Sequence, residues 1–167
     1  MKKLSALLVG LTLSASAAAA SPRLALWITE PIGATNGTQC NLQTSFIPKE
    51  LSTMQPTLTE QDITAWDTVR AIWTLNSARF DSNNDVFKLQ DHCFVLSIDG
   101  KLISSGVVLS AHSARWIGFP TLRVYDRGGE VNLQLISSNQ SSNVRPIHVD
   151  ALDAVLGRRT SVGAGKK

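Results

Sequence analysis

Apolar and polar residues alternate along much of this chain, and a period of two is typical of β-strands that bury one face. The clearest example is the segment EVNLQLI at 130–136, where Val131, Leu133 and Leu135 alternate with polar residues. One face of this strand is expected to meet a core while the other meets water. The same alternation predicts further strands at residues 24–30, 69–75, 93–98, 101–109 and 121–125.

Turn signals join four of these strands into two hairpins. Asp99-Gly100 is the strongest hairpin signal in the chain, because this dipeptide readily adopts the left-handed conformation of tight turns. Residues 126–129, DRGG, join the last two strands in the same way. Because hairpin strands pair antiparallel, an antiparallel sheet is expected. Gly106, inside a strand, predicts a bulge or a close approach of two backbones.

Helical signals are fewer and shorter. Thr59 can cap a helix at 60–66, a short helical segment is expected at 78–80, and Gly157 closes a final helix at 150–156. Because strands dominate, we expect an α+β fold with a mostly antiparallel sheet of about six strands and two or three short helices, in a single domain.

The first 20 residues have the pattern of a cleavable signal peptide. Lys2 and Lys3 precede an apolar run at 4–13, and Ala18 to Ala20 supply a small-residue cleavage site. An anchor helix is the alternative, but the apolar run is too short to cross a bilayer. We therefore expect residues 1–20 to be removed, leaving a periplasmic or secreted protein without a stable membrane span.

Basic residues concentrate at the two ends of the chain. The whole sequence carries 16 Lys and Arg against 13 Asp and Glu, whereas residues 21–156 carry 10 against 13. Residues 21–156 are expected to form the α+β domain, and residues 157–167 a flexible basic tail. A nucleic-acid partner is not expected, because it would need a basic face on the folded domain.

Cys40 and Cys93 are the only cysteines. In an oxidising compartment such a pair predicts a disulfide, which would stabilise the fold by about 3–4 kcal/mol on the loop-entropy model. The alternatives are two unpaired thiols, an intermolecular bridge, or a nucleophilic Cys93 beside His92.

Three segments occur in an order found in a known family. They are LTEQDI at 58–63, WTL at 73–75 and CFVLSIDGKLISSGVVLS at 93–110. Together they resemble the periplasmic head of SecD-type translocase subunits, in which a helix start precedes a strand and a DGK hairpin follows. The resemblance implies an α+β head that contacts another protein or polypeptide. Translocase activity is not implied, because no membrane domain is expected in this chain.

Motifs of metal and catalytic chemistry are incomplete. Asp81, Asn83 and Asp85 match the start of a calcium loop, but Val86 and His92 stand where that loop requires Gly and Glu. The three histidines lack metal-ligand spacing, and neither a nucleophile elbow nor a phosphate loop is present. We therefore expect no metal and no cofactor, and a non-enzymatic protein is favoured. A hydrolase with a dispersed site is a third hypothesis.

The segment AHSARWIGFP at 111–120 is the candidate binding site. It joins the two hairpins and contains His112, Arg115 and Trp116. Arg and Trp are over-represented among the residues that dominate binding energy at interfaces. Alternatively, Trp116 and Phe119 cover the edge of the core while Arg115 points into solvent.

Together these features predict a small exported binding or accessory protein that recognises another protein or an envelope component. The alternative is a periplasmic inhibitor or immunity protein against a secreted hydrolase, with Arg115 and Trp116 inserted into the cleft of that enzyme.

Overall fold

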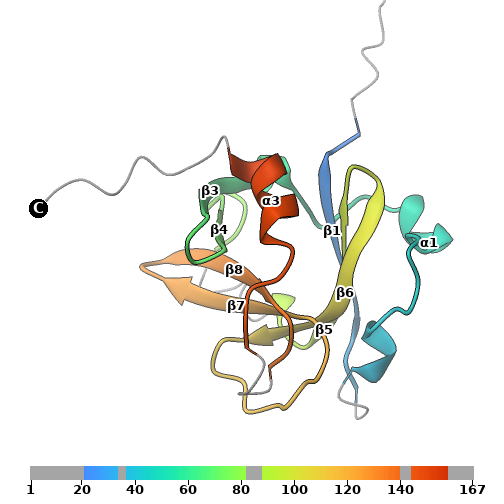
Figure 1. Ribbon diagram of the computed structural model, residues 1–167. Helices are drawn as coiled ribbons and strands as arrows, with labels where there is room; N and C mark the ends of the chain where they lie inside the picture. The colour runs from blue at the N-terminus through green and yellow to red at the C-terminus, as the bar shows by residue number, and fades with distance from the viewer. Residues whose placement is uncertain (1–20, 34–36, 82–87, 140–143, 158–167) are drawn as a thin grey trace, which may run out of the picture.

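The computed structural model describes residues 21–33, 37–81, 88–139 and 144–157. Eight strands form one mixed sheet that curls into a nearly closed barrel (Figure 1). The order of strands across the sheet is β2-β1-β5-β6-β7-β8-β4-β3. The strands are β1 (Leu24–Pro31), β2 (Leu58–Thr59), β3 (Ile63–Asp67), β4 (Ile72–Leu75), β5 (His92–Ile98), β6 (Lys101–Ser110), β7 (Thr121–Arg127) and β8 (Glu130–Ile136).

The expectation of an α+β fold with about six antiparallel strands is wrong. The described chain is mostly β, and the β6–β7 pair is parallel, with Val107 opposite Thr121 and Ser110 opposite Val124. Parallel neighbours need a crossing connection rather than a hairpin. Residues 111–120 supply that connection, which the hairpin signals on either side did not reveal.

The helix predicted at 60–66 is the main local error. Its cap is present, because Thr59 and Asp62 form a reciprocal capping box, but the helical part is one 3-10 turn, η2 (Glu60–Asp62). The β-branched Ile63 and Thr64 then favour an extended backbone. The chain continues as β3, which pairs with β4. Good capping chemistry therefore begins a turn here and not a helix.

Two glycine predictions are confirmed. Asp99 and Gly100 have φ angles of 48° and 74°, as a two-residue hairpin between β5 and β6 requires. Gly106 lies against the end of the 111–120 segment, and a Cβ atom there would be 1.8 Å from the Pro120 carbonyl oxygen. Only a residue without a side chain permits that approach.

The inner face of the curled sheet forms the main core. Trp66, Trp73 and Phe94 are its largest fully buried side chains. Helix α3 (Val149–Leu156), drawn in red in Figure 1, packs against this core. The Trp66 indole donates a hydrogen bond of 2.9 Å to the Asp153 carboxylate. The space left among the inner apolar side chains is about 10 Å³, no more than one water molecule needs. Among the described residues, this cavity is too small to hold an organic ligand.

A second layer covers the outer face of β1, β5 and β6. It contains η1 (Thr38–Cys40) and the single-turn helix α1 (Lys49–Ser52), which lie outside the strands in Figure 1. The predicted disulfide between Cys40 and Cys93 is confirmed, with Cα atoms 5.1 Å apart. It lies in a small outer cluster of buried apolar residues, with Ile32, Val107, Leu109 and Ile117.

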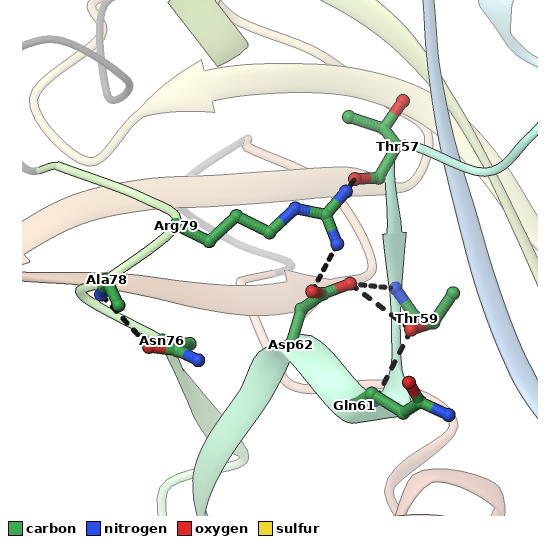
Figure 2. A network of polar contacts seen from close by, with 7 residues as sticks. All are labelled: Thr57, Thr59, Gln61, Asp62, Asn76, Ala78 and Arg79. Atoms are coloured by element: carbon green, nitrogen blue, oxygen red, sulfur yellow. Dashed lines mark hydrogen bonds and ion pairs between the residues drawn. The ribbon is translucent and has the colours of Figure 1, made fainter.

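The two edge strands of the sheet, β2 and β3, are consecutive in the chain. The three residues of η2 join them, so one tight turn spans the gap in the barrel. Asp62 is buried, with 6% of the residue exposed, and the distance from the Thr59 nitrogen to its carboxylate is 2.7 Å. Figure 2 shows that this carboxylate accepts a hydrogen bond from the Thr59 N–H and forms an ion pair with Arg79. Arg79 also donates to the Thr57 carbonyl oxygen at 3.2 Å. We call these contacts the seam network.

Candidate binding site

The connection at 111–120, hereafter the 111–120 loop, runs outside the barrel from the end of β6 to the start of β7. Its buried residue Ile117 enters the outer cluster around the disulfide, and Phe119 packs against the same cluster. The Pro120 carbonyl oxygen accepts a hydrogen bond from the Val107 N–H at 3.3 Å. The second half of the loop is thus fixed to the body of the protein.

Asn139, which follows β8, holds the middle of the loop. Its backbone N–H donates to the Ile117 carbonyl oxygen at 2.8 Å, and its side-chain amide donates to the Arg115 carbonyl oxygen. Arg123 of β7 donates to the Asn139 side-chain oxygen at 3.0 Å, which fixes the orientation of this amide. The backbone on both sides of Trp116 therefore has a defined position.

The four tryptophans differ sharply in exposure. Trp27, Trp66 and Trp73 are buried, whereas Trp116 is 78% exposed. Trp116 therefore does not cover the edge of the core, although Phe119 does pack there. Tryptophan is over-represented among the residues that dominate binding energy at interfaces.

An open hollow of about 450 Å³ lies beside the first half of the loop. It contains two of the three predicted site residues, His112 and Arg115. Trp116 is not part of its wall. The other polar residues that line the hollow are Gln90, Asp91, Ser110 and Ser113.

The Asp91–Arg115 ion pair crosses this hollow, with a distance of 2.8 Å between Nη1 and Oδ1. Both side chains are substantially exposed, so the pair contributes little to stability. The backbone of Asp91 is nevertheless fixed, because its N–H donates to the Val108 carbonyl oxygen and its own carbonyl oxygen accepts from the Ile32 N–H. Asp91 also adopts a positive φ of 62°, a conformation that Asp tolerates better than most residues.

The hollow holds a serine, a histidine and an aspartate, the residue types of a hydrolytic relay. Within the described residues the His112 ring forms no hydrogen bond, and Asp91 is engaged by Arg115 and not by a histidine. The hydroxyl oxygens of Ser110 and Ser113 accept hydrogen bonds from loop N–H groups. These contacts order the loop, and no hydrogen bond joins Ser110 or Ser113 to the His112 ring among the described residues.

The structure also bears on the metal, calcium and thiol chemistry that the sequence motifs raised. No group of three His, Cys, Asp or Glu residues in the described part of the chain is placed to hold a metal ion. Most of the calcium-like segment, residues 82–87, lies outside the described residues, as do residues 1–20 and 158–167. Cys93 is bonded to Cys40, so it does not carry a free nucleophilic thiol.

Sequence reasoning missed Gln90, Asp91 and Asn139. A partial signal for the first two did exist, because the Asp99-Gly100 turn pairs Ile98 with Lys101 and so brings the start of β5 near the end of β6. Regular pairing from that turn would place His92 opposite Val107, and a register shift between Leu96 and Ser97 moves it to Val108. Counting outward along that hairpin brings residues 90 and 91 to the end of β6. No comparable signal identifies Asn139, whose contacts depend on the path of the chain after β8.

Comparison with known proteins finds no matching family model, no matching curated protein and no matching solved structure. The resemblance of residues 58–110 to SecD heads stays a prediction. In the described ranges, none of the helices has the length and apolar character needed to cross a membrane. The intramolecular disulfide is consistent with an exported protein.

Proposed function

We propose that this protein is a small exported, non-enzymatic binding protein that recognises another protein or an envelope component through the 111–120 loop. One observation carries the proposal: Trp116 is exposed to solvent while the peptide groups on both sides of it are fixed by Asn139. The periplasm or the cell exterior is the proposed location.

The anchoring of the loop has a direct consequence for affinity. A partner that binds a flexible loop must order it, and that ordering opposes association. The 111–120 loop is already ordered by Asn139, Ile117 and the Pro120 carbonyl contact. The burial of the Trp116 side chain in an interface can then contribute to affinity with a smaller entropic cost.

The filled interior of the barrel also supports an exterior site. A carrier of small apolar ligands needs an internal cavity of several hundred Å³. The cavity among the inner apolar side chains of the described residues is about 10 Å³, so ligand recognition is better served by the outer surface.

Affinity capture from a cell-envelope extract tests the proposal, with the oxidised protein as bait and a Trp116→Ala variant beside it. The matched control is Phe46→Ala, which removes an aromatic side chain that is 80% exposed on a different segment. We expect one dominant partner that the Phe46→Ala bait retains and the Trp116→Ala bait loses. Unfolding curves of both variants should match the unmodified protein.

A partner that the Trp116→Ala bait retains would contradict the assignment to this loop. A captured hydrolase whose turnover is blocked at one-to-one stoichiometry would identify the binding protein as an inhibitor. Turnover of a substrate by the purified protein, abolished by His112→Ala, would contradict the non-enzymatic proposal.

A further inference from the structure

The hollow beside the 111–120 loop presents hydrogen-bonding groups that the described residues leave unused. The amide of Gln90 and the imidazole of His112 form no hydrogen bond there. The hydroxyls of Ser110 and Ser113 accept from backbone N–H groups, but their protons have no acceptor among the described residues. The hollow therefore offers a ligand both donors and acceptors.

The charges in the hollow compensate one another. Asp91 and Arg115 are the acidic and basic residues that line it, and they form an ion pair with each other. One carboxylate oxygen of Asp91 and two guanidinium nitrogens of Arg115 are not engaged in that contact. An anionic ligand gains little from such a site, whereas a neutral ligand that both donates and accepts can satisfy both partners.

Trp116 follows Arg115 directly in the chain, so their Cα atoms are about 3.8 Å apart. The exposed indole offers a flat apolar face one residue along the loop from Arg115, which lines the hollow. A flat apolar surface combined with paired donors and acceptors matches a sugar ring, which has hydroxyl groups around its edge and apolar C–H groups on its faces.

We propose that the hollow and Trp116 form a binding site for a neutral saccharide of the cell envelope. Sugar hydroxyls bond to Gln90, His112 and the Asp91–Arg115 pair, and a ring face packs on the indole. The volume of about 450 Å³ lies within the range of small-ligand pockets, about 300–1,000 Å³. This inference rests on the proposed function and names the ligand class of its site.

A peptide ligand fits these residues less well. Peptide recognition relies on apolar pockets for side chains or on a free strand edge. Ala114 supplies the only apolar side chain among the residues that line the hollow, and β6 and β7, the strands that flank the loop, are paired with neighbours on both sides. A protein partner is therefore an alternative that the experiment must separate.

The exposure of the tryptophans provides a direct assay. Acrylamide quenches exposed indoles, and Trp116 is the exposed member of the four. The oxidised full chain is screened on an array of neutral and acidic oligosaccharides, and the strongest neutral binder is titrated against acrylamide quenching. We expect bound saccharide to protect Trp116. By calorimetry, Trp116→Ala and Gln90→Ala should each weaken binding about tenfold, while Phe46→Ala leaves it unchanged.

Three results would overturn the inference: no neutral oligosaccharide binds, acidic ones alone bind, or affinity survives both Trp116→Ala and Gln90→Ala. If a protein partner is captured in a Trp116-dependent way while no saccharide binds, the saccharide site is wrong and the proposed function stands. If the captured partner and the saccharide affinity are both indifferent to Trp116→Ala, both proposals fail.

Discussion

The seam network and the 111–120 loop are both short irregular segments held by polar contacts, but they direct their polar groups in opposite ways. At the seam, Asp62 is buried and its carboxylate is used by Thr59 and Arg79 (Figure 2). At the loop, Asn139 fixes the backbone beside Trp116, and the side chains of His112 and Trp116 face solvent.

The comparison distinguishes polar groups that stabilise the fold from polar groups that remain available to a ligand. A buried polar group that has found its partners contributes to the fold and has nothing left to offer a ligand. A loop whose backbone is satisfied by other residues can keep its own side chains free. The polar side chains that remain available to a ligand therefore lie at the loop and not at the seam.

The largest effect is expected from removal of the disulfide that underlies the loop. Cys40→Ala/Cys93→Ala releases a link between residues 53 positions apart, at a cost of about 4 kcal/mol on the loop-entropy model. Chemical denaturation measures this loss. Because Ile117 packs in the same cluster, acrylamide quenching should also show a more mobile environment at Trp116. Unchanged stability would contradict an energetic role for the link.

A smaller loss is expected when the loop is pushed off the sheet. In Gly106→Ala the new methyl group collides with the Pro120 backbone, and relief of that contact costs about 3 kcal/mol. Gly33→Ala is the matched control, because no atom lies within 4 Å of the added Cβ. Denaturation midpoints of the two variants provide the comparison. Equal midpoints would show that the loop does not rest on Gly106 as described.

The seam is tested by the loss of its guanidinium. Arg79→Ala leaves the buried Asp62 carboxylate with Thr59 alone and should cost about 2 kcal/mol. Arg70→Ala removes an exposed arginine whose nitrogen lies 3.9 Å from Asp67, so it should change stability by less than about 0.5 kcal/mol. Amide hydrogen exchange should show faster opening of β2 and β3 in Arg79→Ala alone. Faster exchange across the whole sheet would contradict a local role.

The smallest effect is expected at a polar contact that is exposed on both sides. Arg23 donates to Asp99 at 2.8 Å and thereby lowers the pKa of that carboxyl below its ordinary value. Because the pKa is lower in the folded state, the contribution is present above the unfolded value and is lost as the pH falls. Asp99→Asn keeps a residue suited to the turn. The Asp99→Asn variant should lose slightly less stability than the unmodified protein as the pH falls below about 4. Equal losses in thermal unfolding would contradict this.

Local features of the fold were predictable from sequence, and long-range pairing was not. The strand at 130–136 and the Asp99-Gly100 turn follow from alternation and turn chemistry, which act within a few residues. The parallel β6–β7 pair depends on the route of a ten-residue connection, which no local pattern encodes. β3 was hidden because a correct capping signal at Thr59 also fits a helix.

The candidate site was predictable in part for the same reason. Arg115 and Trp116 stood out by residue type, whereas their supports did not. Asp91 reaches Arg115 through the register of the β5–β6 hairpin, and Asn139 reaches the loop only after β8 has returned along β7. Residue chemistry can identify the groups that meet a ligand, but the groups that hold them are set by the three-dimensional path of the chain.

The placement of both sheet edges at one turn also bears on self-association. Unpaired strand edges are the templates on which foreign strands add during fibril growth. Here the edges are the two-residue β2 and the five-residue β3, the latter in contact with α3. A misfolded neighbour thus meets one very short edge and one that a helix flanks. The same three residues that bridge the gap in the barrel therefore also limit the strand edge that another chain could extend.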